Sequence, residues 1–250
     1  RILHEVERNV YIFNGGSGFF VNTLIFDSEE GLILIDTQME DENNEILIKL
    51  LKEKFPNKDI HSFIISHAHL DHFIGLSFFR DAFGEFEIVG IEGEKKHMME
   101  SMDTLWPTYE RLSEKSNLEK TDKHYPTKEI KHDYAFQFYD KSAHVEIVDA
   151  NESWTSLIVY LPESETVYVG DMYWGDIVIE PEIGATVLGW SRELHNVLEK
   201  KITTVIPGHA PFLFTRENLQ TFVDNIDKLV ATGRHLIDKG IDKEAFVKYD

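Results

Sequence analysis

The order of apolar and polar positions predicts a sheet at the start of the chain and helix–strand units after it. Apolar runs at 10–13, 19–26 and 32–35 indicate three short strands, and a glycine-rich turn separates the first two. Residues 41–54 carry apolar side chains at helical spacing, and a mostly apolar run follows at 60–65. Such a run is typical of a buried strand. The chain therefore begins as a β-meander and then turns to β-α-β alternation.

The second half of the chain repeats these signals after a weaker stretch. Residues 97–133 predict an excursion from the core, which begins with a helix that runs up to Pro107. Helices are expected at 191–200 and after Thr215, a plausible N-cap, and a short last helix is expected after Gly240. Strands are expected at 134–139, 144–148, 156–161, 166–169 and 202–206.

Composition and charge narrow the function classes. The chain has 250 residues and is 42% hydrophobic, so we expect one globular α/β domain over residues 1–250. Its 25 Lys and Arg against 45 Asp and Glu give a net charge of −20, which disfavours nucleic acid and anionic membranes as partners. Apolar runs fall far short of a membrane span. A small-molecule substrate is the remaining expectation, and the oligomeric state stays open.

The chain lacks cysteine and begins with Arg1 rather than Met. Disulfides and thiolate ligands are therefore excluded, so any metal must be held by His, Asp or Glu. The first residue is compatible with the loss of an upstream segment. Both a cytoplasmic and an exported location remain possible.

A histidine-rich loop carries the strongest chemical signal. Three histidines and one aspartate, His67, His69, Asp71 and His72, fall within six residues directly after the strand at 60–65. His67 and His69 are two apart on an extended loop and can point at one metal, whereas Asp71 and His72 can serve a second. All four suit Zn²⁺. The motif predicts a metal site rather than a solvated polar loop.

Two further strands end at a residue of the kind that binds metals. The strand at 166–169 runs into a glycine and Asp171, and the strand at 202–206 runs into a glycine and His209. Either residue alone is compatible with a capped turn. Sheets of α/β proteins build sites at the carboxyl ends of their strands, so together with the histidine loop these residues are better explained as ligands.

Three phrases in the chain resemble the signatures of the metallo-β-lactamase superfamily, and they lie at 66–75, 169–171 and 206–211. The general shape is most similar to the lactamase-like subgroup that includes relatives of quinoprotein relay proteins. The resemblance implies an α/β fold of the αβ/βα type, a four-layer sandwich of two mixed β-sheets with helices outside. It also implies that Asp171 bridges two metals, that His209 is the last histidine ligand, and that Asp36 supports the metal loop from below.

One position departs from the family pattern. Where the family usually has a third histidine for its first metal site, the count back from Ser156 places Glu152. A glutamate can bind zinc, but it favours Mn²⁺ or Fe²⁺ more than an imidazole does. The alternatives are that Asn151 or Asp149 binds the metal, or that the first site is weak and the protein is mononuclear or inactive.

The resemblance and the residues together give a hypothesis of mechanism. Two Zn²⁺ ions would share a bridging hydroxide that attacks a carbonyl or similar electrophile, and Asp71 would orient the hydroxide and shuttle its proton. The ligands would divide into a first site of His67, His69 and Glu152, a second site of Asp71, His72 and His209, and Asp171 as the bridge.

Aromatic residues near these motifs predict an apolar cleft. Phe19, Trp106, Trp154 and Trp174 are the candidate substrate contacts, although such residues also occur as core or rim. A small lactam, lactone or ester would suit the cleft, since Lys and Arg do not gather in the sequence for a phosphate or a glutathione. The alternative is a mononuclear iron oxidoreductase of the persulfide-dioxygenase kind, or a metal-binding protein without turnover.

Overall fold

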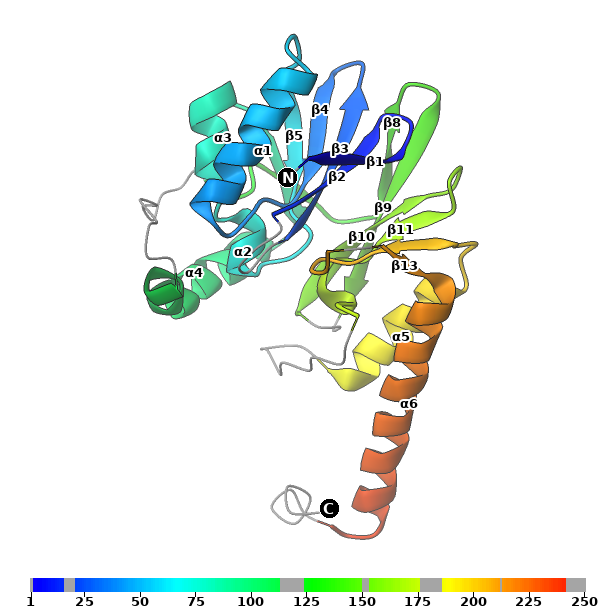
Figure 1. Cartoon of the computed structure of the whole chain (residues 1–250). Helices are drawn as coiled ribbons and strands as arrows, with labels where there is room; N and C mark the ends of the chain where they lie inside the picture. The colour runs from blue at the N-terminus through cyan, green and yellow to red at the C-terminus, as the bar shows by residue number, and fades with distance from the viewer. Residues whose placement is uncertain are drawn as a thin grey trace.

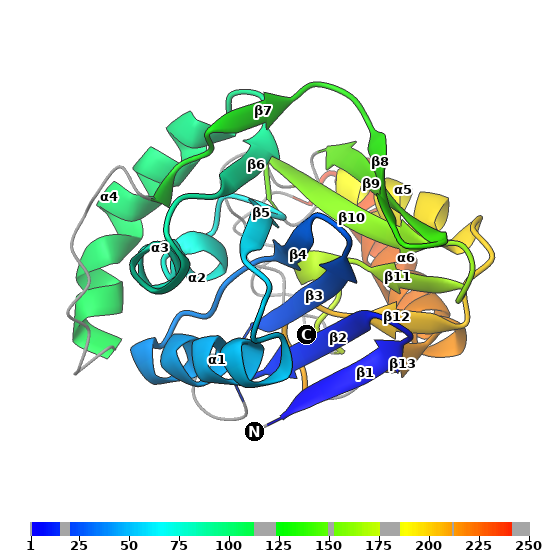
Figure 2. The same ribbon diagram turned by 90° about the horizontal axis from the view of Figure 1, so that it is seen from above.

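Two β-sheets pack face to face, and helices cover the outer face of each (Figures 1 and 2). The computed structural model describes residues 2–15, 21–112, 124–149, 153–175, 186–211 and 213–241. Both sheets mix parallel and antiparallel pairs. The predicted four-layer sandwich of two mixed sheets is therefore confirmed.

The first sheet has seven strands in chain order. Its first four strands pair antiparallel: three of them form the predicted meander, and the strand Leu3–Glu7 adds a fourth that the sequence did not predict. The later three strands join by parallel pairs. Helices cross between the parallel strands, as parallel pairing requires. The strands are β1 (Leu3–Glu7), β2 (Val10–Asn14), β3 (Asn22–Ser28), β4 (Gly31–Ile35), β5 (Ile60–Ile64), β6 (Glu87–Ile91) and β7 (Lys128–Ile130).

The second sheet has six strands in the order β13-β12-β11-β10-β9-β8. Its single parallel pair, β11 with β12, places the carboxyl ends of these two strands at the same edge. The strands are β8 (Tyr134–Phe138), β9 (Lys141–Asp149), β10 (Thr155–Leu161), β11 (Thr166–Tyr168), β12 (Thr204–Ile206) and β13 (Phe214–Thr215).

The helices divide between the two outer faces (Figure 2). The first sheet carries α1 (Asp41–Lys54), α2 (Leu70–Phe73), α3 (Leu76–Phe83) and α4 (Glu94–Leu112), and the second carries α5 (Val187–Leu198) and α6 (Arg216–Asp238). A 3₁₀ turn, η2 (Gly170–Met172), follows β11. In the described part of the chain, no helix is long and apolar enough to cross a membrane.

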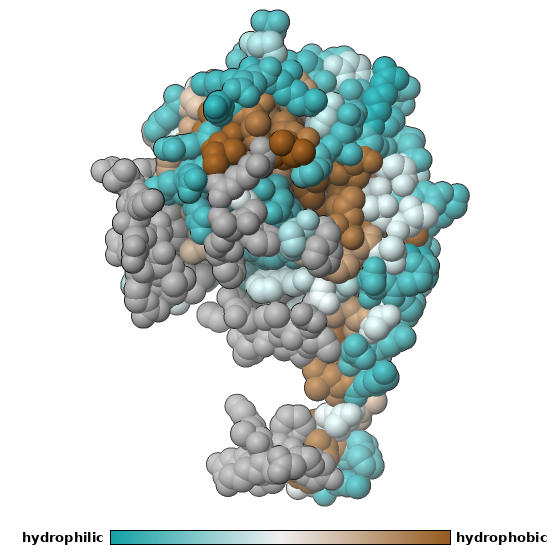
Figure 3. Space-filling view, in the orientation of Figure 1, coloured by the Kyte–Doolittle hydropathy of each residue, from teal (hydrophilic) through white to brown (hydrophobic). Residues whose placement is uncertain are grey.

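Apolar side chains form three buried clusters that hold the layers together. One lies between the first sheet and its helices, one between the two sheets, and one between the second sheet and its two helices. Burial of this apolar surface is the main force that fixes the sheets relative to each other. In Figure 3, hydrophilic residues gather along the upper and right-hand outline of the molecule, and hydrophobic residues show in the middle of this face.

The structure differs from the expected elements in places where packing overrides local signals. The helix predicted to stop at Pro107 extends as α4 to Leu112, with Pro107 inside it. Its earlier part is held by Met98 and Met102, which are buried in the first cluster, so tertiary packing offsets the cost of the proline. Within the range 97–133, predicted as an excursion, α4 packs on the core and β7 pairs with β6.

The final long helix begins where the sequence predicts. The Thr215 side chain accepts from the backbone N–H of Asn218, and the Asn218 side chain accepts from the Thr215 N–H, which completes a capping box. The preceding helix begins earlier than predicted, at Val187, with Thr186 as its N-cap. The short helix expected after Gly240 falls almost wholly outside the described residues.

Candidate functional site

Strands from both sheets end at one edge of the sandwich and bring the predicted ligands together. Asp36 follows β4, and the histidine loop with α2 follows β5 in the same sheet. Asp171 follows β11, and His209 follows β12 in the other sheet. Backbone hydrogen bonds join the two sheets at this edge. The Leu157 N–H donates to the Ser66 carbonyl at 2.6 Å, and the Asn22 N–H donates to the Gly208 carbonyl at 2.7 Å.

Six of the seven predicted ligands form two groups that share one carboxylate. Asp71, His72, Asp171 and His209 offer ligand atoms that lie within 4.8 Å of one another, and so do His67, His69 and Asp171. These groups match the expected division of the ligands, apart from Glu152. Asp171 belongs to both groups and lies between them.

The Asp171 carboxylate is the centre of the distances. Its Oδ2 atom lies 3.3 Å from His72 Nε2, 3.1 Å from His209 Nε2 and 3.7 Å from His67 Nε2. His209 Nε2 also lies 3.2 Å from Asp71 Oδ2. Nitrogen and oxygen atoms that converge at these separations are arranged to face a common cation.

Asp36 holds the histidine loop from beneath. Its Oδ2 atom lies 2.7 Å from His72 Nδ1 and accepts hydrogen bonds from the hydroxyls of Ser66 and Tyr168, each at 2.6 Å. Its Oδ1 atom accepts the Ser66 N–H at 2.7 Å. Fixing Nδ1 of His72 in this way orients Nε2 toward the other ligands. These contacts agree with the supporting role that the family resemblance implies for Asp36.

Ser66 and Tyr168 are supporting residues that the sequence reasoning did not single out. The Ser66 hydroxyl lies 2.9 Å from Nδ1 of His67, so it links Asp36 to a second histidine. Tyr168 is fully buried, and burial together with nearby Asp36 raises the pKa of its hydroxyl well above its ordinary value. A polar-tipped residue in an apolar strand, three positions before Asp171, is the signal that could have pointed to it.

The charges in the site balance through opposite shifts in pKa. Burial lowers the pKa of His209, but the Asp171 and Asp71 carboxylates outweigh it and raise that pKa to about 10. Burial would raise the pKa of Asp171, but His209 and His72 hold it well below its ordinary value. Burial, together with His72 and His69, holds the pKa of His67 well below its ordinary value. The carboxylates of Asp71 and Asp171 are therefore ionised and are stabilised by positive charge beside them. His67 is held in the neutral imidazole form, which is the form that binds metals.

The donor set fits divalent metal ions. His72 Nε2 and Asp171 Oδ1 are buried and have no hydrogen-bond partner among the described residues. A buried polar atom without a hydrogen bond is costly, so each requires a ligand. Imidazole nitrogens and carboxylate oxygens without thiolates suit Zn²⁺, Fe²⁺ or Mn²⁺. His67, His69, Asp71, His72, Asp171 and His209 would hold the ions.

The structure does not test the ligand predicted near residue 152. Glu152 and Asn151 fall outside the described residues, and so does Phe19. Asp149 is the exposed last residue of β9. The predicted ligand at this point of the chain therefore remains a prediction.

The predicted tryptophans differ in their relation to the site. The Trp174 ring lies 4.7 Å from the His209 ring, at the edge of the ligand cluster. Trp154 is 50% exposed and stacks on His97 of α4 at 5.0 Å. Trp106 is partly buried against the cluster beneath the first sheet. Trp174 is thus the tryptophan whose contact with a predicted ligand the structure shows.

A comparison of the sequence with protein families and with known proteins points to metallo-beta-lactamases in both cases. The sequence profile of the metallo-beta-lactamase superfamily matches residues 16–209. A metallo-beta-lactamase type 2 from Bacillus cereus is 22% identical over 219 residues, which are 83% of this chain and 76% of that protein.

Solved structures share the fold at low identity. A metallo-beta-lactamase from Pontibacter korlensis superposes with a TM-score of 0.70 at 17% identity, over 90% of this chain and 98% of that one. A stereoselective inverting sec-alkylsulfatase from Pseudomonas sp. superposes with a TM-score of 0.76 at 18% identity, over 96% of this chain and 43% of that longer one. The profile match over most of the sequence, on a sandwich whose edge collects the histidine loop, Asp171 and His209, establishes that this chain belongs to the metallo-beta-lactamase superfamily.

Proposed function

We propose that the protein is a dinuclear zinc-dependent hydrolase of a small organic substrate of the lactam, lactone or ester type. The observation that carries the proposal is the position of Asp171, whose carboxylate belongs to both groups of ligand atoms. A carboxylate shared in this way is suited to two cations held a few ångströms apart. A single-metal site would not need a second pair of imidazoles, His72 and His209, beside the pair His67 and His69.

The chain's own residues divide the work of hydrolysis. When bound, paired divalent ions supply a water of lowered pKa and polarise the bond that is cleaved. His67 and His69 would hold one ion with Glu152, and Asp71, His72 and His209 would hold the other. Asp71 is 11% exposed in its side chain and so borders the open side of the cluster. Its carboxylate would accept a proton from the nucleophile and pass it to the leaving group.

The Trp174 side of the site favours contact with an apolar part of the substrate. Trp174 packs beside His209 and offers an apolar face next to the ligands. The relatives support hydrolysis of this general kind, because they include metallo-beta-lactamases and an alkylsulfatase. Their low identity leaves the choice among lactam, lactone and ester to experiment.

Metal content measured together with hydrolysis tests the proposal. Mass spectrometry on protein purified without added metal is expected to find close to two zinc ions per chain. A screen with a lactam, a lactone and an aryl ester is expected to find turnover of at least one. One iron per chain without hydrolysis would overturn the proposal and favour the iron oxidoreductase.

Two variants assign the roles of single residues. Asp71→Ala is expected to lower turnover by about 10²-fold or more, since general acid–base groups contribute about that much. Asp140→Ala, on the exposed turn between β8 and β9, is the matched control and should leave turnover unchanged. An Asp71→Ala protein with full activity would remove this residue from the mechanism. Glu152→Ala should lower the zinc content toward one ion per chain.

A further inference from the structure

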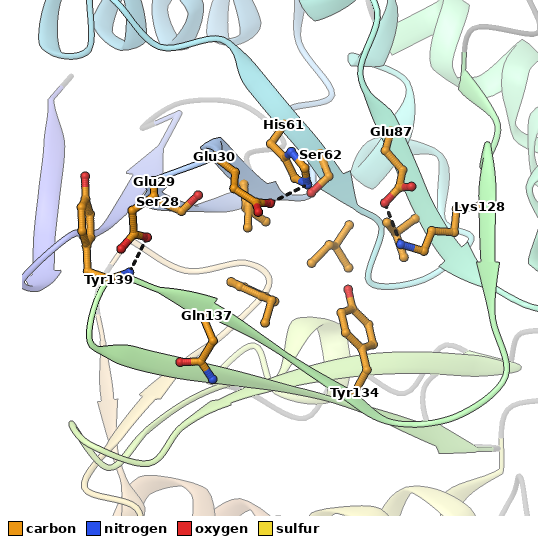
Figure 4. A pocket seen from close by; sticks show the side chains of 14 residues that line it. Ser28, Glu29, Glu30, His61, Ser62, Glu87, Lys128, Tyr134, Gln137 and Tyr139 are labelled. Atoms are coloured by element: carbon orange, nitrogen blue, oxygen red, sulfur yellow. Dashed lines mark hydrogen bonds and ion pairs between the residues drawn. The ribbon is translucent and has the colours of Figure 1, made fainter.

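A cavity opens at the edge of the sandwich opposite to the ligand cluster. Figure 4 shows the side chains that line it. The ligand cluster follows the carboxyl ends of β4 and β5, whereas this cavity is lined by the β3–β4 turn, by His61 and Ser62 at the start of β5, and by Glu87 at the start of β6. Strand β8 of the second sheet closes its other side. Its volume of about 410 Å³ lies within the range of small-molecule sites.

The floor of the cavity is apolar and partly aromatic. Ile33, Ile64 and Val89 come from the inner face of the first sheet, and Tyr134 and Phe136 come from β8. All five belong to or pack on the cluster between the sheets. A flat apolar ligand that enters from this edge would therefore pack against these side chains, and its apolar surface would be removed from water.

Two hydroxyl groups in the cavity lack a protein partner. Ser62 is 5% exposed, and its hydroxyl makes no hydrogen bond with the described residues. The same holds for the hydroxyl of Tyr134, which points from β8 toward β5 and β6 in Figure 4. Burial, with a smaller contribution from the nearby Glu87 carboxylate, raises the pKa of Tyr134 above its ordinary value, so this hydroxyl keeps its proton. Both oxygens can accept a hydrogen bond from a ligand.

The charges at the rim favour a cation. Three glutamates, Glu29, Glu30 and Glu87, line the cavity, and Lys128 is the lysine that lines it with them. Lys128 lies 3.0 Å from Glu87, so its charge is already matched. The neighbouring Lys58 pairs with Asp27. Glu29 accepts the Tyr139 N–H at 2.8 Å, and Glu30 Oε2 lies 3.7 Å from Nε2 of the lining His61. Among the residues that the structure describes, neither glutamate is paired with a lysine or arginine there, so the rim keeps an excess of negative charge, in a chain of net charge −20.

We propose that this cavity is a binding site for a small amphiphilic organic cation, a protonated amine carried on a flat apolar body. The body would lie on the apolar floor, and the ammonium would donate to the hydroxyls of Ser62 and Tyr134 beneath the carboxylates of Glu29 and Glu30. Carboxylate or phosphate ligands are disfavoured by the same rim. The site is separate from the ligand cluster and does not depend on the proposed hydrolysis.

Calorimetric titration with matched probes tests the charge preference. Tryptamine offers the cation, N-acetyltryptamine the neutral analogue and indole-3-propionate the anion on the same ring. Tryptamine is expected to bind one per chain with a Kd of about 1 mM or tighter, and the other two much more weakly. Equal binding of tryptamine and indole-3-propionate, or no binding of tryptamine, would overturn the proposal.

Variants of the cavity locate the binding. Glu29→Gln with Glu30→Gln is expected to weaken the binding of tryptamine by about tenfold, since each exposed carboxylate contributes modestly. Tyr134→Phe should weaken it by about fivefold, through the loss of one hydrogen bond. Glu45→Gln with Glu53→Gln, exposed on α1, changes the net charge equally and is the matched control.

The outcomes separate this cavity from the ligand cluster. Affinity that is unchanged in both cavity variants would place the amine elsewhere and contradict the proposal. Loss of binding in His209→Ala would place it at the ligand cluster, with the same consequence. Binding that persists in His209→Ala and weakens in the cavity variants supports the site even if no hydrolysis is found.

Discussion

The Oδ2 atom of Asp36 lies 2.7 Å from Nδ1 of His72, in a fully buried pair that joins β4 to the histidine loop. Asp36 adopts a positive φ of 61°, a conformation that aspartate and asparagine tolerate better than most residues. The backbone at this position turns the carboxylate under the loop. The orientation of the imidazole at the candidate metal centre therefore depends on the end of a neighbouring strand.

Replacing Asp36 by asparagine is expected to weaken both the fold and metal binding. Asn keeps the shape and tolerates the backbone, but it removes the charge that His72, Ser66 and Tyr168 share. We expect a loss of about 2–4 kcal/mol in the free energy of unfolding and about 10–100-fold in metal affinity. Urea denaturation and competition with a chromophoric chelator measure the two effects. Tyr168→Phe keeps the charge, so a loss as large as that of Asp36→Asn would contradict this account.

Gly208 lies against Asp171, so any side chain there should disturb the shared carboxylate. A Cβ atom at Gly208 would lie 1.9 Å from Asp171 Oδ1 and 2.8 Å from the Gly170 carbonyl carbon. Gly208→Ala is therefore expected to lower turnover by about 10²-fold, since a shift of about 1 Å costs this much. Metal content and kcat are the measurements.

Gly233 provides the control for this substitution. It lies inside α6, and a Cβ atom there meets nothing within 4 Å. Gly233→Ala should stabilise the helix by about 0.5–1 kcal/mol and leave kcat unchanged. If the two alanine variants behave alike, the contact between Gly208 and Asp171 has no bearing on activity.

Metal stoichiometry is expected to distinguish the shared ligand from an unshared one. Asp171 belongs to both groups of ligand atoms, whereas His209 belongs to one. Asp171→Asn should therefore lower the content of both ions, and His209→Ala should lower it by about one ion per chain. Mass spectrometry of the purified variants measures this difference. Equal losses in the two variants would show that Asp171 does not bridge.

Glu94 is expected to destabilise the protein at high pH. It is 1% exposed, and its Oε2 accepts the Ile91 N–H at 2.7 Å. Burial raises the pKa of Glu94 to about 8 from an ordinary value of 4.5. Between these values the folded state keeps a proton that the unfolded state releases, so stability falls as pH rises and the full penalty applies above about pH 8.

Glu94→Gln removes this titration and should reveal its size. Compared with the unaltered protein, the variant should gain on the order of a few kcal/mol in unfolding free energy at about pH 9, relative to the difference at about pH 5. Denaturation at the two pH values measures it. Glu100→Gln, exposed on the same helix, is the control and should show little change with pH. A Glu94→Gln gain that does not grow with pH would contradict the raised pKa.

Local patterns predicted the elements and residues whose signal lies close together in sequence. The helix Asp41–Lys54 and the start of α6 at Thr215 agree with the structure, because spacing and caps are read within one turn. The histidine loop was recognisable because its four residues are nearly consecutive. Short strands such as β1, β6 and β7 were missed, since their pairing partners and not their own sequence make them strands.

Contacts between distant segments could not be predicted from the sequence. Tyr168 reaches Asp36 across the two sheets, and its role depends on how the sheets pack. The cavity at the opposite edge likewise combines the starts of β5 and β6 with β8. Neither the contact nor the cavity leaves a signal in the local sequence, so each can be recognised only from the tertiary structure.

The candidate metal centre draws ligands from both sheets, and this division has a kinetic consequence. His67 to His72 belong to the first sheet, whereas Asp171 and His209 belong to the second. Contacts between such distant parts of a chain close long loops, and long-range closure is the slow part of folding. We therefore expect metal uptake by a refolding chain to follow the docking of the two sheets, so the rate of uptake reports that docking step directly.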